Sequence, residues 1–307
     1  AEVTVPALLA ALGRGEPVAG VYRGASPPSL DALPFPAWDL VDLAARDRFC
    51  ASVVVDLGRG AWAFPIDGRT LPMVTSRGCP FTCLHCSSNP GREEGEPKTQ
   101  RRYSADRLRA YLGAMVTGHR ATRLEVLDEL VNVNERHWDA FLDAVTELGV
   151  PFDVPNGMRA DYLEPGHLAR MKGLVTTVSV SAESGVQRVV TEVVKKRLDL
   201  RAVVRAAESA RAAGVPLMVH YIIGLPGESA AEIGYVPQHI FLTDDTIRNR
   251  GQYVRDLEEG AGALPIGVTF MVEGEENILL VTHAGQFALI SKKYPSNICL
   301  LCLISAK

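Results

Sequence analysis

The 307-residue chain has the composition of an ordinary globular protein, with 47% apolar and 22% charged residues. Its formal net charge of −4 is too small to indicate nucleic acid or an anionic membrane as a general partner. The sequence shows neither a secretory signal nor a run of about 20 apolar residues. We therefore expect a cytoplasmic protein, in which clustered cysteines bind metal more often than they form disulfides.

Residues 1–48 differ in composition from the rest of the chain. A short helical pattern, "PALLAALGRG", runs into the proline-rich stretch "GASPPSLDALPFPAWDLVDL". Proline fixes φ and lacks the amide donor that a sheet needs, so this stretch is typical of an extended segment on a domain surface. We predict an N-terminal linker over residues 1–48.

From about residue 70, short apolar or β-branched runs alternate with amphipathic helical stretches. The predicted strands are Leu71–Ser76, Arg123–Leu127, Pro151–Val154, Val175–Ser181 and Pro216–Ile223. The predicted helices are Ser104 (cap) to about Val116, Glu135–Leu148 ended by Gly149, and Asp199–Ala213 ended by Gly214. This alternation predicts an α/β fold with a parallel sheet, as a full or partial (β/α) barrel whose chemistry lies at the C-terminal ends of its strands.

The stretch "VTSRGCPFTCLHCSSNP" follows the first predicted strand and holds three of the six cysteines, Cys79, Cys83 and Cys86. Three soft thiolates on one loop can hold three corners of an iron–sulfur cube and leave the fourth iron open. Zinc is the alternative, with a fourth ligand from His85 or from another cysteine (Cys50, Cys299 or Cys302). The CxxxCxxC spacing is unusual for a closed zinc site, so the pattern favours a cluster.

Several motifs in the same order resemble a known family. "RGCPFTCLHCS" resembles the signature of the radical S-adenosylmethionine (SAM) enzymes. "LDALPFPAWDLVDL" upstream and "YIIGLPGES" downstream resemble the subgroup that follows a cobalamin-binding domain. The resemblance covers roughly residues 15–230 and implies a partial TIM-like barrel over residues 49–232, preceded by a cobalamin-binding domain that this chain lacks.

The resemblance also implies a chemistry. Cys79, Cys83 and Cys86 would ligate a 4Fe–4S cluster whose fourth iron chelates SAM. An electron donor such as flavodoxin or ferredoxin would supply one electron. SAM would then be cleaved to a 5′-deoxyadenosyl radical that abstracts hydrogen from a small-molecule or natural-product substrate. The subgroup implies methyl transfer through cobalamin. The ring of His85 occupies an aromatic position of the family, and we expect it to pack rather than to ligate.

Two further motifs match positions that the family uses near SAM. Asp128 and Glu129, in "EVLDELVN", match an acidic pair close to the SAM amino group; the alternative is a solvated acidic loop. Arg159 and Asp161, in "GMRADYL", match an Arg-x-Asp element of the subgroup. Arg159 would pair either with a carboxylate in the cavity or with Asp161 or Glu164 in a structural role.

The last two barrel strands end in polar motifs. Ser181 and Glu183, in "VSVSAESGVQRVV", match family positions that approach SAM, and the following Ser-Gly pair is either an anion site or a plain N-cap. Gly224 and Gly227, in "YIIGLPGES", match the turn that lies along the adenine. The basic run Lys195–Arg197 is expected to be solvated surface without a role.

The pattern weakens after residue 232, where we predict an atypical C-terminal segment, 233–307. A junction near residue 232, artificial or natural, that joins unrelated pieces is the simplest account, and a chance similarity is the alternative. "EIGYVPQHIFLTDDTIRNR" resembles the Q-loop region of ABC-transporter ATPases, with Gln238 as the glutamine. No GxxxxGK(S/T) loop accompanies it, so the sequence gives no basis for nucleotide hydrolysis.

Strands are predicted at Ile266–Val272 and Ile278–Thr282. The CxxC of "NICLLCLISAK", Cys299 and Cys302, lies among apolar residues, which favours a buried or aggregation-prone strand over a redox pair or a second cluster. The alternative to a radical SAM enzyme is a non-catalytic, truncated remnant in which a cluster or a zinc ion has a structural role.

Overall fold

The computed structural model describes residues 3–22, 24, 27–57, 64–66, 68–86, 88, 99–222, 225, 227, 229 and 232, together with three short strands in the C-terminal segment. The helices are α1 (Thr4–Gly13), α2 (Leu43–Leu57), α3 (Ala105–Gly113), α4 (Glu135–Leu148), α5 (Pro165–Met171) and α6 (Leu200–Ala213). The strands are β1 (Thr70–Met73), β2 (Ser76–Arg77), β3 (Arg101–Arg102), β4 (Arg123–Val126), β5 (Phe152–Asp153), β6 (Val178–Glu183), β7 (Leu217–Tyr221), β8 (Ile278–Val281), β9 (Phe287–Ile290) and β10 (Cys302–Ala306).

The long helices begin and end where their capping residues predict. The side chain of Asn134 accepts a hydrogen bond from the amide of His137 at the start of α4, and Gly149 ends the helix with a left-handed φ of 61°. Helix α6 has the same plan, with Asp199 as its cap and Gly214, at φ 68°, after its last turn. The bounds predicted for α4 and α6 are therefore confirmed.

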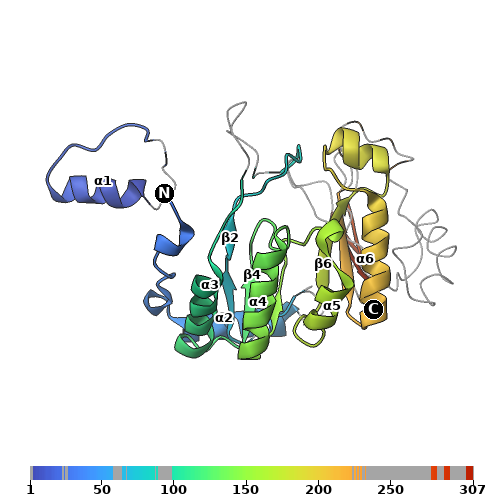
Figure 1. Ribbon diagram of the computed structural model, residues 1–307, viewed down its shortest axis with the longest axis horizontal. Coiled ribbons are helices and arrows are strands. Elements are labelled where there is room, and N and C mark those ends of the chain that lie inside the picture. The colour runs from blue at the N-terminus through green and yellow to red at the C-terminus, as the bar shows by residue number, and fades with distance from the viewer. Residues whose placement is uncertain are drawn as a thin grey trace.

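The strands form an arc with the topology of a partial (β/α) barrel. Strand β4 pairs in parallel with β1 and with β5, and β6 pairs in parallel with β7. A single parallel bridge between Met158 and Val180 joins the two groups. The parallel order is thus β1–β4–β5–β6–β7, and α3 to α6 flank it (Figure 1). The predicted fold class is confirmed.

The core lies between these strands and the helices that cover them. Trp138 and Phe141 of α4 stack at 5.4 Å between ring centroids, and Phe152 of β5 meets both rings edge-on. Leu124 and Val126 of β4 are completely buried in the same cluster. Alternate residues of each strand belong to this core, so the residues between them face the concave side of the arc.

The N-terminal segment contacts the barrel more closely than its composition indicates. The Phe35 ring stacks on Tyr111 of α3 at 5.0 Å, and the Arg107 guanidinium lies 3.7 Å from the Phe35 ring centroid. Asp31 accepts a hydrogen bond from the Ser104 amide at 2.9 Å. Helix α2 was not predicted, whereas α1 coincides with the predicted helical pattern. Helix α1 buries no residue and stands apart from the strands (Figure 1).

Three strands are described in the C-terminal segment. Strand β8 confirms the strand predicted at Ile278–Thr282 and pairs antiparallel with β9. Strand β10, which contains Cys302, pairs antiparallel with β7 at the edge of the arc. The predicted strand Ile266–Val272, Gln238 and Cys299 lie outside the described residues. No helix in the described part of the chain combines the length and apolar character that crossing a bilayer requires.

Candidate active site at the cysteine loop

The cysteine loop lies at the C-terminal end of β1, directly after β2, where a barrel of this kind places its chemistry. The Leu84 amide donates a hydrogen bond to the Val194 carbonyl at 2.8 Å, which ties the loop to the segment after β6. Cys83 packs against a small apolar cluster that includes Val189, Val194 and Ile222. The loop therefore sits over the C-terminal ends of β6 and β7.

The three cysteines are in the thiol form and half-buried. Burial is the main cause that raises the pKa of Cys83; Glu183 and Cys79 raise it further, and Lys196 and Arg159 oppose them. Cys79 and Cys83 are thus close enough to interact electrostatically.

Among the described residues, no group of three or more His, Cys, Asp or Glu side chains is placed to hold a metal ion. Three soft donors on one loop suit a cluster, because a cube offers each thiolate its own iron, whereas a closed zinc site needs four donors on one ion. The donor set therefore fits an iron–sulfur cluster, and Cys79, Cys83 and Cys86 as its ligands remain a prediction.

Gly78 gives the loop its entry turn. Its φ is +87°, and a Cβ at this position would lie 2.6 Å from the Thr99 carbonyl oxygen. Its amide donates to the Glu129 carboxylate at 3.2 Å. Both the backbone conformation and the close approach of Thr99 require glycine here.

We expect Gly78→Ala to destabilise the protein by about 1–3 kcal/mol, the usual cost of a strained backbone position, and to lower the iron content after reconstitution. The control is Gly113→Ala in α3, where an added Cβ meets nothing within 4 Å and should not destabilise the protein. Denaturant unfolding and iron analysis measure both effects. Equal stability and iron content in the two variants would contradict the prediction.

Asp128 and Glu129, which we predicted as a pair near SAM, have different surroundings. Asp128 is completely buried, and its carboxylate accepts hydrogen bonds from the Thr75 amide at 2.6 Å, the Thr75 hydroxyl at 2.7 Å and the Ser76 hydroxyl. Burial raises the pKa of Asp128, and these hydrogen bonds oppose the rise. Asp128 therefore fastens the end of β1 to the end of β4, and only Glu129 reaches the cysteine loop.

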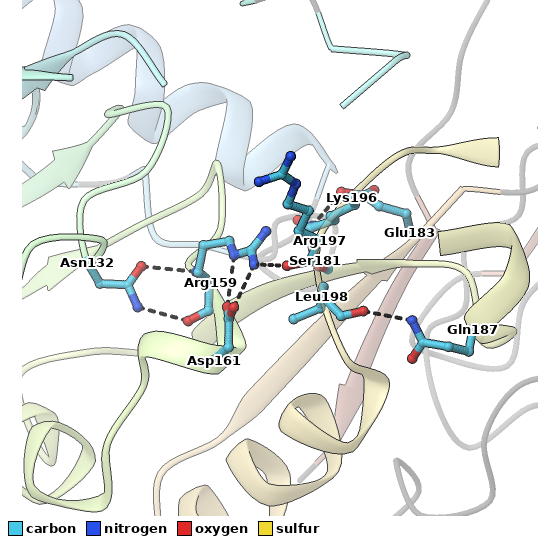
Figure 2. Close-up of polar contacts among 9 residues, drawn as sticks. All are labelled: Asn132, Arg159, Asp161, Ser181, Glu183, Gln187, Lys196, Arg197 and Leu198. Atoms are coloured by element: carbon cyan, nitrogen blue, oxygen red, sulfur yellow. Dashed lines mark hydrogen bonds and ion pairs between the residues drawn. The ribbon is translucent and has the colours of Figure 1, made fainter. Parts of the chain in front are cut away.

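Arg159 is 2% exposed and holds several parts of the site together (Figure 2). Asn132 brackets its backbone, accepting from the Arg159 amide at 3.0 Å and donating to its carbonyl at 2.9 Å. Its guanidinium donates two hydrogen bonds to Asp161, at 2.8 and 2.6 Å. The guanidinium carbon also lies 4.1 Å from the Phe81 ring centroid, in the cysteine loop. We predicted that Arg159 pairs either with a carboxylate in the cavity or with Asp161 or Glu164, and the structure has the pair with Asp161.

Lys196 was predicted to be solvated, and that prediction is wrong. It is 6% exposed, and its ammonium group donates to Glu183 Oε1 at 2.8 Å and to the Ser181 carbonyl at 2.6 Å (Figure 2). Glu183 itself is a non-glycine residue in the left-handed region, with φ 69°. The burial of Lys196 is not visible in the sequence pattern, because its partner lies 13 positions away, beyond the reach of any helical or strand periodicity.

Three more residues from the predicted motifs have local contacts around β6. The Ser184 hydroxyl accepts from the Val186 amide at 3.2 Å, a local bond of the capping kind. The carbonyl of Gly227 accepts a hydrogen bond from Arg188 at 3.1 Å. His85 Nε2 is 3.9 Å from Glu183 Oε2. Gly224 lies outside the described residues.

The concave face near this site carries a buried polar pair that the sequence analysis did not identify. Ser179 of β6 and His220 of β7 are hydrogen-bonded through the hydroxyl and Nε2. Leu217, Val219 and Tyr221 belong to the core cluster, so His220 faces the other side of β7. Burial is the main cause that lowers the pKa of His220, to about 4.

A neutral buried histidine makes stability depend on pH. The pKa of His220 is lower in the folded protein than its ordinary value of 6.5, so the unfolded chain binds the proton first as the pH falls. Below about pH 6.5, stability should therefore decrease, by up to about 3 kcal/mol when pH 4 is reached, at about 1.4 kcal/mol per pKa unit.

His220→Gln should lack this part of the decrease. Because other groups titrate equally in both proteins, the difference in unfolding free energy between wild type and variant isolates His220. Denaturant unfolding at intervals between pH 7.5 and pH 4 measures it, and identical slopes for the two proteins would contradict the assignment.

The sequence is similar to a known protein family and to two curated proteins. The family model described as "Radical SAM superfamily" matches residues 73–236. The chain is 26% identical over 217 residues to cytidylyl-2-hydroxyethylphosphonate methyltransferase of Streptomyces wedmorensis, a match that covers 66% of this chain and 37% of that protein. It is 25% identical over 248 residues to the uncharacterized methyltransferase PH0819 of Pyrococcus horikoshii, covering 76% and 49%. The chain thus matches less than half the length of either relative.

Solved structures with a similar fold include the cobalamin-dependent S-adenosylmethionine radical enzyme OxsB with aqua-cobalamin and S-adenosylmethionine bound. That match has a TM-score of 0.46 and 14% identity, and covers 62% of this chain and 30% of OxsB. Methylornithine synthase (PylB) matches with a TM-score of 0.36 and 14% identity, covering 58% and 51%. Both TM-scores are below 0.5, so the assignment to a family depends on the sequence match.

Proposed function

The chain belongs to the radical SAM superfamily, and on that premise we propose that it holds a 4Fe–4S cluster and cleaves SAM reductively. The observation that carries the proposal is the position of the cysteine loop. It lies at the C-terminal end of β1 and is hydrogen-bonded to the segment after β6. This is the end of a (β/α) barrel at which catalytic groups gather.

Each part of the site has a role in this proposal. Cys79, Cys83 and Cys86 would hold the cluster, which with SAM would supply the 5′-deoxyadenosyl radical. Glu129 would face the SAM amino group, because its carboxylate already borders the loop at Gly78. Asp128 is left out, because its carboxylate is occupied by Thr75 and Ser76.

Two further groups would border SAM. Ser181 and Glu183 stand at the C-terminal end of β6, in the positions that the family resemblance assigns near SAM, and Gly227, with Gly224, would border the adenine. Arg159 would position the loop by stacking on Phe81. The apolar cluster against Cys83 would exclude water from the reacting groups.

The organisation of the chain follows from the same proposal. Residues 49–232 would be the radical SAM core, 1–48 a linker from a cobalamin-binding domain outside this chain, and 233–307 an atypical C-terminal segment. Two curated relatives are named as methyltransferases, which supports transfer of a methyl group through cobalamin to a small-molecule or natural-product substrate. A small protein such as a flavodoxin or ferredoxin would donate the electron.

Anaerobic reconstitution with iron and sulfide tests the proposal. We expect Mössbauer and absorbance signals of a 4Fe–4S cluster, followed by 5′-deoxyadenosine formation when dithionite and SAM are added. Protein that remains colourless and free of iron would contradict it. A cluster without any deoxyadenosine would instead favour the truncated, non-catalytic remnant, and bound zinc in place of iron would favour a structural metal site.

A further inference from the structure

A buried ion pair lies next to the cysteine loop. Lys196 and Glu183 are 2.8 Å apart, and their side chains are only 7% and 10% exposed. The Lys196 ammonium group is also bonded to the Ser181 carbonyl. Both charges are therefore held in fixed positions and away from the solvent that would screen them.

The backbone on both sides of this pair is unusual. Glu183 and Lys195 are non-glycine residues with φ of 69° and 56°. Such positions cost free energy, and they gather at functional sites. The segment between β6 and α6 is stabilised further by Gln187, whose side chain donates to the Leu198 carbonyl at 2.8 Å (Figure 2). The ion pair between Lys196 and Glu183 thus forms where the backbone is strained.

The cysteine loop contacts the residues around this pair directly. The Leu84 amide is hydrogen-bonded to the Val194 carbonyl, two residues before Lys196. Cys83 packs in the apolar cluster that contains Val194. His85, between the second and third cysteines, has its Nε2 3.9 Å from the Glu183 carboxylate. One negative and one positive charge thus stand beside the loop that would hold the cluster.

We propose that Glu183 and Lys196 shift the reduction potential of the cluster in opposite directions and offset one another, because they place one negative and one positive charge beside the cysteine loop. This inference rests on the proposed function, because it requires the cluster at Cys79, Cys83 and Cys86. Reduction adds one electron from an external donor to the cluster, so a nearby positive charge favours it and a negative charge opposes it. The net charge around an iron–sulfur cluster and its solvent exposure are known determinants of its potential. A pair of this kind would act on the cluster through its charges, without ligating it.

The two halves of the pair make opposite predictions. Glu183→Gln removes a negative charge, keeps the shape of the side chain and leaves Lys196 unbalanced, so the midpoint potential should become more positive. Lys196→Met removes the positive charge and leaves Glu183 unbalanced, so the potential should become more negative. The double variant Glu183→Gln/Lys196→Met should return close to the wild-type value.

A redox titration with mediators and dithionite, followed by electron paramagnetic resonance of the reduced cluster, measures these shifts. It is performed on the full chain without SAM, so that any contact between Glu183 and SAM does not contribute. The matched control is Glu147→Gln, which neutralises a carboxylate in the exposed ion pair with Arg109, 3.4 Å apart with side chains 50% and 66% exposed. Solvent screening should leave the potential of this control unchanged.

The outcomes separate the inference from the function on which it rests. Opposite shifts in the two single variants support the inference, because a purely structural pair would lower cluster content in both without opposite shifts. Unchanged potentials, or shifts of the same sign, would overturn it while leaving the cluster and SAM cleavage intact. If Lys196→Met does not fold, the nearly isosteric Glu183→Gln decides alone, and an unchanged potential in it overturns the inference. A wild-type protein that assembles no cluster would instead overturn the proposed function.

Discussion

On the proposed function, Cys83→Ala should abolish cluster binding and, with it, the production of 5′-deoxyadenosine. A cube held at three corners by protein thiolates loses a third of its protein ligands in this variant, and no other cysteine in the described part of the chain lies on the loop to replace Cys83. Because alanine is smaller and apolar, and Cys83 packs in an apolar cluster, the fold should tolerate the change. We expect iron and sulfide content to fall to a small fraction of that in the wild type and deoxyadenosine to fall to background.

Cys50→Ala is the matched control for this prediction. Cys50 lies in α2, is also a free and half-buried thiol, and is not part of the loop. Its variant should keep the iron content and the absorbance of the wild type. Retention of a full cluster in Cys83→Ala, or equal losses in both variants, would show that the loop is not the site.

Asp128→Ala will destabilise the protein strongly. Its buried carboxylate accepts hydrogen bonds from the Thr75 amide, the Thr75 hydroxyl and the Ser76 hydroxyl. Each buried donor left without an acceptor costs about 1–3 kcal/mol, so the loss of stability should reach about 3 kcal/mol or more. The Thr75 hydroxyl also lies 2.8 Å from His137 Nε2, and removal of the carboxylate disturbs that contact as well. Denaturant unfolding at neutral pH measures the change.

Asp106→Ala provides the comparison, because the Asp106 side chain is fully exposed and only 3.8 Å from Arg109 at its nearest. This change should cost less than about 1 kcal/mol. If Asp128→Ala were equally mild and instead weakened SAM binding, then the carboxylate would serve SAM, as the family resemblance implies. The stability measurement thus decides between the two roles.

Local signals in the sequence were sufficient for most of the fold. Helices α4 and α6 have an Asn or Asp cap, an apolar stripe and a terminal glycine, each of which acts within a few residues. Strand β4 alternates charged and apolar residues before α4, and β7 is a mostly apolar run after α6. The cysteine loop, predicted from its spacing and its place after the first strand, lies at the C-terminal end of β1. The superfamily predicted from the motifs is confirmed by the match over residues 73–236.

Long-range contacts were beyond the sequence analysis. Lys196 stands in a basic run that has the composition of solvated surface, and only the folded chain brings it to Glu183. The sequence around Asp128 is typical of an exposed acidic loop. In the folded chain its carboxylate is buried and accepts from Thr75, 53 positions earlier. Periodicity and capping do not predict contacts of this kind, because both depend on residues that are close along the chain.

The single bridge between Met158 and Val180 has a mechanical consequence. Because the described strands on either side of it share no longer ladder, the two halves of the arc should separate most easily along this seam. Arg159 connects the two halves. Its backbone is hydrogen-bonded to Asn132 in one half, and its guanidinium donates to the Arg197 carbonyl in the other. Asp153 of β5 also crosses the seam, accepting from the Thr176 amide at 3.0 Å, so these two side chains join the halves where the strand ladder does not.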